Sequence, residues 1–492
     1  MRPSGRFRSS VAIASLVLVV SACSNTSSSP AASAAESAAA PPPSAAASEA
    51  PSASASAAAS QAAGASAEPT AVTGASCASS ATVVKFWTSH TPPDSNALKD
   101  IVNAFNAANP DICVQMTTVP GAETDIAKLL TSIRGGVAPD VYMADRFTVP
   151  QRAAEGVLDQ LPDGTINAAD YSAFAYAETQ FQGKTYAIPF DTDARALWYN
   201  VDLLKAAGCD MTKFDMSKGA TTIADVTACA DKVSKKDSSG NYSIMGWMPG
   251  GPGAGGNAGA FDQGWHYTWG FDYGGKFADL TACKVTPTDP GVVAGYQFLY
   301  DWAKAHDPQA VSRWVTTNLP PNPPAAQNPF WTGKLGMTIS GDWRIAEQAQ
   351  YAPNGHYAFT YIPVPKAGDP TSTWAGGWSF ALIPGSKAKD QAIKFMQYIG
   401  GTQGQTVYTK ESTHLPTLLA LQKDPSLYDP QHTLFLNLLP TAKSRPPLAV
   451  GAAYWDALTS AQGSVELNTK QPMDALTEVQ STVQPQLDAV GC

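Results

Sequence analysis

The stretch TVVKFWTSHTPPDSNALKDIVNAFNAANPDICVQM, residues 82–116, decides the fold class. Its first part, 82–87, is a short apolar run that predicts a buried strand, and 96–105 carries apolar residues three and four positions apart, as an amphipathic helix does. Pro110 ends that helix because proline cannot continue it. Residues 112–116 then predict a second strand. A strand, a helix and a strand in succession are the unit from which parallel sheets are built.

The same alternation continues beyond this stretch. We expect a helix over 126–133 and a strand over 140–144, so three strands joined by two helices imply a parallel sheet in an α/β fold. In such sheets the ligand crevice lies beyond the carboxyl ends of the strands. Polar residues just after the strands are therefore candidate ligand contacts: Ser89, His90, Glu123, Asp145 and Arg146.

Composition favours two large lobes over a small or disordered product. The chain has 492 residues, of which 44% are hydrophobic and 15% charged. Its formal charge of −9 becomes −12 if the three arginines before residue 9 are removed with a signal segment, leaving 29 basic residues of the original 32 against 41 acidic ones. Such a charge disfavours nucleic acid and anionic lipid headgroups as partners, because both attract basic proteins.

The N-terminus is typical of an exported lipoprotein. Basic residues precede the apolar run 11–20, which is too short to span a bilayer, so we expect residues 1–22 to be a cleaved signal peptide. The sequence VSAC at 20–23 resembles a bacterial lipobox, which predicts lipidation of Cys23 and anchoring at the outer face of the cytoplasmic membrane. The alternative is an ordinary secretory signal with a chance cysteine.

The segment after Cys23 predicts a disordered tether. Residues 24–76 contain 22 alanines, 14 serines and 6 prolines, with no aromatic or basic side chain. Such a segment buries too little apolar surface to offset the entropy of ordering it. We therefore expect residues 23–76 to join the membrane anchor to the folded body.

Six cysteines remain after Cys23, and an even number in an exported chain favours disulfides. None forms a C-x-x-C pair, so no zinc or redox site is expected. We expect Cys77 to pair with Cys113 because each borders an early strand. We expect Cys209 to pair with Cys229 across a short loop. This leaves Cys283 for Cys492 by elimination only.

Catalytic and cofactor signatures are scarce. The chain has no H-E-x-x-H or G-x-S-x-G motif, and the G-x-G-x-x-G match at 251–256 sits in a Gly/Pro-rich loop instead of a strand-to-helix turn. Asp191 and Asp193 could bind a metal or form half of a glycosidase pair, but no clustered partners accompany them. We therefore expect no metal and no cofactor.

Tryptophan is abundant instead. Of the 12 tryptophans, several stand beside glycine or a charged residue, namely Trp265, Trp269, Trp343, Trp374 and Trp378. Sugar rings have an apolar face and a rim of hydroxyls, so their sites combine flat aromatic groups with carboxylates and guanidinium groups. The alternative for each tryptophan is a place in the hydrophobic core.

Several ordered sequence blocks together resemble family 1 of the extracellular solute-binding proteins, which deliver carbohydrates to ABC importers. The blocks are FWT (86–88), GGVAPDV (135–141), YAIPFDTD (186–193), GKLGMTISGDW (333–343) and GGWSFALIP (376–384). The resemblance extends over residues 82–492. It implies an α/β fold of the type II periplasmic-binding-protein class, a two-lobed clamshell with hinge segments and an interlobe cleft. The expected division is lobe 1 at 78–188 with 362–404, lobe 2 at 193–357 with 408–492, and hinges near 189–192, 358–361 and 405–407.

The resemblance also implies ligand contacts. By position in the family's blocks they are Ser89, His90, Asp145, Asp193, Trp343, Gly377, Trp378 and Arg445, with Trp269 in an uncertain register. We add Glu123, Arg146, Asp191, Arg195 and Trp265 as candidates. Structural alternatives remain open: the two aspartates of 191–193 as hinge-turn hydrogen-bond acceptors, Arg146 and Arg195 as interlobe ion pairs, and Asp145 as a helix cap.

The implied function is capture of a mono- or oligosaccharide by lobe closure, without catalysis. The expected partners are a sugar, the permease subunits of an ABC importer and the bilayer that holds Cys23, with no nucleic acid and with the protein as a monomer. The alternatives are a secreted carbohydrate-active enzyme, a surface interaction lipoprotein, and a binding protein for a peptide, a polyamine or glycerol phosphate.

Overall fold

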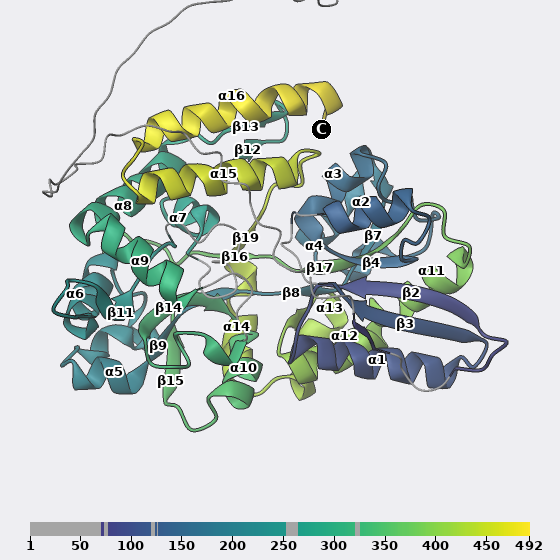
Figure 1. Ribbon diagram of the computed structural model, residues 1–492, viewed down its shortest axis with the longest axis horizontal. Helices are drawn as coiled ribbons and strands as arrows, with labels where there is room; N and C mark the ends of the chain where they lie inside the picture. Colours follow the sequence, from purple (N-terminus) through teal and green to yellow (C-terminus); the bar gives the residue numbers. More distant parts are fainter. Residues whose placement is uncertain (1–69, 73–76, 120–123, 125, 252–263, 320–324) are drawn as a thin grey trace, which may run out of the picture. The chain divides into compact units, whose positions relative to one another are not determined.

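The three predicted strands lie together in a six-stranded sheet in the computed structural model, which describes residues 70–72, 77–119, 124, 126–251, 264–319 and 325–492 (Figure 1). The strand order is β1(Thr70–Val72), β3(Ile112–Thr118), β2(Thr82–Thr88), β4(Val141–Asp145), β17(Trp378–Leu382) and β7(Ala187–Pro189). Strand β2 pairs in parallel with both β3 and β4, which confirms the predicted parallel core. Strands β17 and β7 extend it in antiparallel pairing.

The predicted helices are also confirmed. Helix α1(Asp94–Ala108) buries Leu98, Ile101 and Phe105, the three- and four-residue spacing that covers a sheet with one helical face. It ends two residues before Pro110, as the sequence predicts. Helix α2(Ala127–Arg134) begins and ends one residue later than expected, within the usual variation of helix ends.

A second, five-stranded sheet follows in the order β10(Lys235–Lys236), β11(Tyr242–Trp247), β14(Leu335–Gly341), β9(Arg195–Asn200) and β15(Tyr357–Thr360). Strand β9 pairs antiparallel with β14 and β15, and β14 pairs in parallel with β11. Every residue of β14 is buried, as expected for a central strand covered on both faces. With two mixed sheets and helices around them, the protein has the two-lobed α/β fold implied by its sequence.

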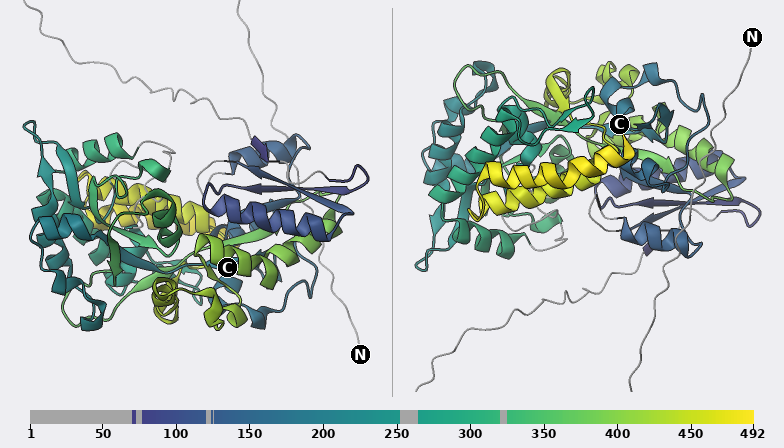
Figure 2. Two further views of the ribbon diagram at one scale, coloured as in Figure 1. Left: turned by 90° about the horizontal axis from the view of Figure 1, so that it is seen from below. Right: turned by 90° about the horizontal axis from the view of Figure 1, so that it is seen from above.

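Helices cover both sheets and fill most of the remaining chain. They are α3(Val149–Ala154), α4(Ala173–Ala177), α5(Val201–Ala206), α6(Ile223–Val233), α7(His266–Asp272), α8(Pro290–Ala305), α9(Pro308–Asn318), α10(Arg344–Tyr351), α11(Lys389–Ile399), α12(Thr402–Ser412), α13(Leu419–Gln422), α14(Pro430–Leu436), α15(Gly451–Glu466) and α16(Pro472–Val490). Figure 2 shows α15 and α16 side by side at the C-terminal end of the chain. Among the described residues, no helix combines the length and hydrophobicity that a membrane crossing requires.

Short strand pairs join segments that lie between the two sheets. Strand β8(Asp191–Thr192) pairs antiparallel with β18(Leu415–Pro416), and β16(Thr373–Ala375) pairs in parallel with β19(Ala442–Ser444). Because β7 belongs to the first sheet and β9 to the second, the chain passes between the sheets through β8. It returns at Gly376 and Gly377, between β16 and β17.

The hydrophobic clusters show which segments pack with which sheet. Ile362 and Trp374 pack in the cluster of the second sheet, whereas Tyr408 and Leu421 pack in the cluster of the first. The expected lobe division instead places residues 362–404 in lobe 1 and residues 408–492 in lobe 2. Burial against a particular sheet face decides such membership, and no local sequence pattern shows it. The exact lobe boundaries therefore stay a prediction.

One short strand lies within the predicted tether. Residues Thr70–Val72, inside the predicted tether, form the edge strand β1 by antiparallel pairing with β3. This strand belongs to the compact unit Ala67–Cys492. The preceding unit, Met1–Ser66, which contains the predicted signal peptide, Cys23 and most of the tether, lies outside the described residues.

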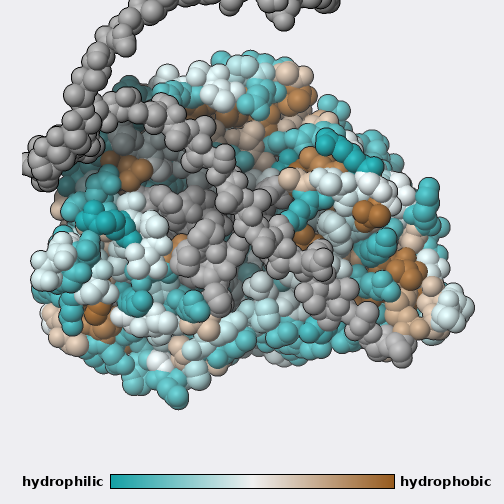
Figure 3. Space-filling view, viewed as in Figure 1, coloured by the Kyte–Doolittle hydropathy of each residue, from teal (hydrophilic) through white to brown (hydrophobic). Residues whose placement is uncertain are grey.

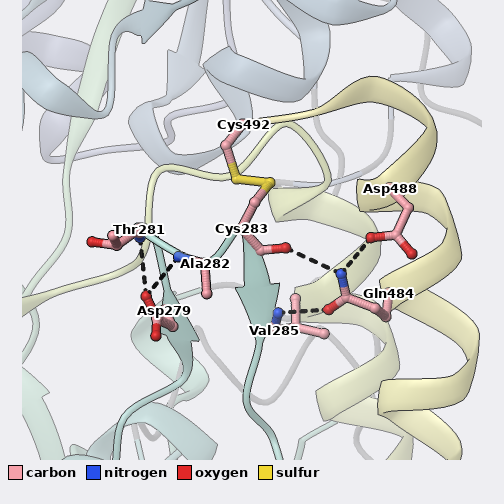
Figure 4. The surroundings of a disulfide bond; sticks show 8 residues. All are labelled: Asp279, Thr281, Ala282, Cys283, Val285, Gln484, Asp488 and Cys492. Atoms are coloured by element: carbon pink, nitrogen blue, oxygen red, sulfur yellow. Dashed lines mark hydrogen bonds between the residues drawn. A yellow bond between two sulfur atoms is a disulfide. The ribbon is translucent and has the colours of Figure 1, made fainter.

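All three expected disulfides are present. Cys77 pairs with Cys113, Cys209 with Cys229, and Cys283 with Cys492. The last bond ties the C-terminus to β13(Lys284–Val285), beside a hydrogen bond of 3.1 Å from the Gln484 amide of α16 to the Cys283 carbonyl (Figure 4). It closes a loop of 209 residues, so it constrains the unfolded chain most strongly of the three.

Candidate functional site

The candidate site is centred on β8 and the Gly376-Gly377 turn. The Asp191 carboxylate accepts a hydrogen bond from the backbone N–H of Trp378 at 2.5 Å, and the Asp193 carboxylate accepts one from that of Gly376 at 2.6 Å. Gly377 has φ +125°, and a Cβ there would collide with the Arg146 guanidinium and the β8 backbone. The turn therefore requires glycine at this position. Both aspartates therefore accept hydrogen bonds from this turn, which is the structural alternative given for them above.

Arg146 connects this turn to the first sheet by hydrogen bonds. It follows β4 directly, is fully buried, and donates from Nε to Glu178 at 3.0 Å. Its other nitrogens donate to the backbone carbonyls of Asp191 and Gly376. Burial raises the pKa of Glu178 above its usual range, although the guanidinium groups of Arg146 and Arg445 oppose that rise.

Arg445 forms the second pair. Its guanidinium donates to both carboxylate oxygens of Asp145, at 3.1 Å for the Nη1 to Oδ2 contact, and lies 4.0 Å from the ring centroid of Phe147. The Asp145 side chain makes no cap hydrogen bond to the following helical turn, so it acts as an ion-pair partner and not as a helix cap. Strand β4 belongs to the first sheet, whereas β19 pairs with β16, whose Trp374 packs in the hydrophobic cluster of the second sheet, so this pair links the two.

Arg195, the first residue of β9, forms the third pair, with Asp193. Its Nη1 also donates to the Trp374 carbonyl at 3.0 Å, and its guanidinium carbon lies 3.3 Å from the centroid of the Trp374 ring. Burial alone would raise the pKa of Asp193, but Arg195 and the N–H of Gly376 hold it below its usual range. We call these three pairs the guanidinium cluster: Arg146, Glu178, Arg195, Asp193, Arg445 and Asp145.

A second group of charges lies beside β8. His414, between α12 and β18, has ring nitrogens near three carboxylates: 3.7 Å from Asp94, 3.5 Å from Asp191 and 3.9 Å from Asp342. We call these four residues the imidazole cluster. Burial by itself lowers the pKa of His414, but the carboxylates raise it to about 10. Burial raises the pKa of Asp191 to about 6 and that of Asp342 well above its usual range.

The predicted tryptophans separate into two sets. Trp343, Trp378 and Trp265 are partly exposed, as a surface for stacking requires. Trp269 and Trp374 are fully buried, and the Trp269 indole donates to the Pro249 carbonyl at 2.6 Å inside the core of the second sheet. Trp269 therefore lies in the hydrophobic core, the alternative given for each tryptophan, and the proposed ligand contacts do not include it.

His90 and Ser89 follow β2 at the edge of the same region. The His90 ring contacts the Trp378 ring edge-on at a centroid distance of 4.6 Å, and its Nδ1 lies 3.0 Å from the Tyr408 hydroxyl. Burial lowers the pKa of His90 to about 4, so this imidazole is neutral at pH 7. Ser89 is partly exposed. Glu123 and the greater part of the glycine-rich loop lie outside the described residues.

The fold thus brings together ten of the predicted residues from distant parts of the sequence: His90, Asp145, Arg146, Asp191, Asp193, Arg195, Trp343, Gly377, Trp378 and Arg445. Their contact with a ligand stays a prediction. Four further residues of these clusters were not among the predicted site residues: Glu178, Asp342, His414 and Asp94. Asp342 lies in a quoted block, beside Trp343, whereas the others carry no motif. Within the described part of the chain, no three His, Cys, Asp or Glu side chains are grouped to hold a metal ion.

Comparisons with known proteins identify the family. The family model of the bacterial extracellular solute-binding proteins matches residues 88–406. The maltooligosaccharide ABC transporter solute-binding lipoprotein of Streptococcus pneumoniae R6 is 23% identical over 344 residues, covering 67% of this chain and 72% of that protein. The sn-glycerol-3-phosphate-binding periplasmic protein of Salmonella typhimurium LT2 is 24% identical over 376 residues, covering 72% of this chain and 78% of that protein.

Solved structures agree on the fold. The structure of CpMnBP1 with mannobiose bound has a TM-score of 0.70 and 21% sequence identity, and the match covers 81% of this chain and 99% of that one. Because the family model spans more than half of the sequence, the chain belongs to the bacterial extracellular solute-binding proteins.

Proposed function

We propose that this protein captures a neutral mono- or oligosaccharide for an ABC importer, at a site formed by the guanidinium cluster and the partly exposed rings of Trp343 and Trp378. The observation that carries the proposal is charge matching. Each of the three guanidinium groups meets an acidic side chain, so the cluster offers directed hydrogen-bond donors and acceptors with its cations already paired. Such a set suits the hydroxyls of an uncharged ligand beside aromatic rings.

The Asp145–Arg445 pair supports a closing motion as part of this function. It joins β4 of the first sheet to the segment after β19, which packs with the second. A sugar that engages groups of both sheets favours the form in which they are close together, because only that form offers all contacts at once. We propose that the chain turns at β8 and at Gly376 and Gly377 during this motion.

A sugar ligand also fits the names of similar proteins, since the pneumococcal relative is a maltooligosaccharide lipoprotein and CpMnBP1 binds mannobiose. The salmonella relative binds sn-glycerol 3-phosphate, which makes that anion the second candidate. A phosphate group calls for cations that are not already neutralised, and the pairing of all three cluster arginines favours the neutral sugar.

A thermal-shift screen of the full-length protein tests the proposal. Mannobiose, maltose, longer maltooligosaccharides and monosaccharides are compared with sn-glycerol 3-phosphate, peptides and polyamines. A ligand that binds only the native protein raises the unfolding midpoint. We expect a neutral sugar to raise it, and chromatography of the recovered sugar to show it unchanged. A shift by the phosphate or by a peptide alone would refute the sugar assignment, and cleavage of the sugar would favour the enzyme alternative.

We propose that the protein works as a lipid-anchored monomer at the outer face of the cytoplasmic membrane, with Cys23 as the lipidated residue and ABC permease subunits as partners. Figure 3 favours this over a surface adhesin, because the hydrophobic areas on the face shown are small and separate. The exposed large hydrophobic residues are also spread over several elements, for example Val83 of β2, Leu434 of α14 and Met473 of α16. In cell fractionation, Cys23→Ala should release the protein from membranes, and retention would refute the anchor.

A further inference from the structure

His414 is a buried residue that the proposed ligand contacts do not include. Its side chain is only 7% exposed and lies where α1, α12, β8 and the end of β14 meet. Helices α1 and α12 pack with the first sheet, and β14 is central in the second. His414 therefore touches both halves of the fold from the segment that links α12 to β18.

Three aromatic rings stack at this point. The His414 ring lies nearly parallel to the Tyr408 ring, at 12° and a centroid distance of 5.4 Å. The Trp343 indole is also nearly parallel to the imidazole, at 21° and 5.6 Å. Tyr408 belongs to α12 and Trp343 follows β14, so the stack joins a helix of the first sheet to a strand end of the second.

Carboxylates hold the imidazole in this stack. Asp94 of α1 lies near Nε2, while Asp191 of β8 and Asp342 after β14 lie near Nδ1. The three distances, 3.5 to 3.9 Å, are those of ion pairs and are longer than direct hydrogen bonds. A positive imidazole fits this site, because three acidic groups surround it and a cation between aromatic faces is stabilised by their π electrons.

Trp343 depends on its neighbours for its orientation. Its ring packs over Gly341, where a Cβ would overlap the indole, and the Arg195 guanidinium lies 5.6 Å from its centroid. Its backbone N–H donates to Asp342 at 3.0 Å. His414 stacks on the indole, so loss of the imidazole removes this ring contact.

We propose that His414 is a positioning residue for sugar binding: its ring, held by carboxylates from α1, β8 and the end of β14, fixes the indole of Trp343. This inference rests on the proposed function, since Trp343 is a ligand contact only if the site binds sugar. The imidazole itself is buried against protein groups and makes no contact with the sugar.

The charge of His414 gives this role a pH dependence. The carboxylates raise its pKa to about 10, so the cation persists through neutral pH and is lost only in alkaline solution. The titratable groups that face it, or interact with it electrostatically, are Asp94, Asp191, Asp193, Asp342, Tyr408, His90 and His432. Of these, only Tyr408 has an ordinary pKa in the alkaline range, and burial raises that pKa further.

The first experiment observes Trp343 without any ligand. The full-length protein is labelled with 5-fluorotryptophan, and the Trp343 fluorine signal is assigned as the one missing in Trp343→Phe. We expect this signal to stay constant from neutral pH to about pH 9 and then to shift with a midpoint near pH 10. In His414→Gln it should start at a different shift and lack that transition. A Trp343 signal that is the same in both proteins at every pH would overturn the proposal.

The second experiment measures affinity by calorimetry, with mannobiose and maltose as probes. We expect His414→Gln to weaken binding about tenfold at pH 7.5, the scale of one lost cation–π contact. His414→Lys keeps the charge and should recover part of the affinity, whereas His414→Phe keeps only the ring. The matched control is His356→Gln. His356 also pairs with an aspartate, Asp202, at 3.0 Å, but its side chain is 74% exposed, and its loss should leave affinity unchanged.

The outcomes separate the two proposals. If neither disaccharide nor any other sugar of the thermal-shift panel binds the wild-type protein, the sugar assignment fails, while the fluorine signal still tests whether His414 positions Trp343. If a sugar binds wild type and His414→Gln equally well, the positioning role is refuted although the sugar assignment stands. Should His414→Gln fail to fold, His414→Lys and the alkaline titration of wild type provide the same tests.

Discussion

The guanidinium cluster and the imidazole cluster bury charge in two different ways. The first contains three arginines and three carboxylates, each arginine in contact with its own partner. The second contains one histidine for three acidic groups, and burial raises the pKa of Asp342 well above its usual range and that of Asp191 to about 6. We therefore expect the first cluster to depend on its pairing and the second to depend on pH.

The largest expected effect comes from breaking a pair. Arg445→Met leaves the buried Asp145 carboxylate without its cation, so we expect a loss of about 3–5 kcal/mol in the free energy of unfolding. Denaturant titration at pH 7.5 measures it. Arg313→Met is the control, because Arg313 is exposed and bonds only to Asn241 in the described structure, and it should cost less than about 0.5 kcal/mol. A loss below 1 kcal/mol for Arg445→Met would mean that this pair is not tightly buried.

A matched pair of aspartate substitutions sharpens the comparison. Asp193→Asn keeps an acceptor for the Gly376 N–H but removes the charge that faces Arg195, and should cost about 3 kcal/mol. Asp342→Asn keeps the acceptor for the Trp343 N–H and removes a carboxyl whose pKa burial raises well above its usual range, so it should cost less than Asp193→Asn, less than about 1 kcal/mol. Equal costs in denaturant titrations would contradict the distinction between the clusters.

The alkaline pH dependence of stability comes next. Because the folded pKa of His414 is raised above the unfolded value of 6.5, its contribution is complete below pH 6.5 and is lost as pH rises toward 10. Between pH 6.5 and 9.5, wild type should lose about 3 kcal/mol more than His414→Gln. Asp272, with a pKa raised to about 8 by burial, titrates in both proteins and cancels in the difference. Parallel curves for the two proteins would refute a charged His414.

The smallest expected effect is on the loss of stability as the pH falls below 6.5. Burial lowers the pKa of His90 to about 4, so the stability that comes from its neutral form is present above pH 6.5 and is lost as pH falls toward 4. Over that range His90→Gln should lose about 2 kcal/mol less than wild type, measured by thermal unfolding. His266 and His432, also buried and neutral, remain in both proteins. A larger acid loss in the variant would contradict a neutral His90.

Local sequence patterns were sufficient to predict the three parallel strands of the first sheet, β2, β3 and β4. The apolar run of β2 and the helical spacing of α1 each identify their element without distant information, and Pro110 defines the helix end. The disulfide predictions are confirmed for a related reason, because two of the three bonds join cysteines that are only 36 and 20 residues apart in the sequence. Asp145 and Arg146 were identified because residues after parallel strands share one edge of the sheet.

The rest of the site depends on contacts between distant segments. Glu178 meets Arg146 across 32 residues, and His414 meets Asp94 across more than 300, so no spacing rule connects them. Trp269 resembled an exposed platform because glycine follows it. In the fold, that glycine instead lets the Phe277 ring pack closely against α7. Membership of segments such as 408–427 in one lobe or the other likewise follows from packing and not from a local pattern.

The central claim is that paired charges and partly exposed indoles bind a neutral sugar. Calorimetric titration of the full-length protein with the sugar panel and with sn-glycerol 3-phosphate, at about 50 mM and 500 mM NaCl, tests it most directly. We predict that a neutral sugar binds one-to-one with the same affinity at both salt concentrations and that the phosphate does not bind. Binding of the phosphate alone, weakened by salt, would contradict the account.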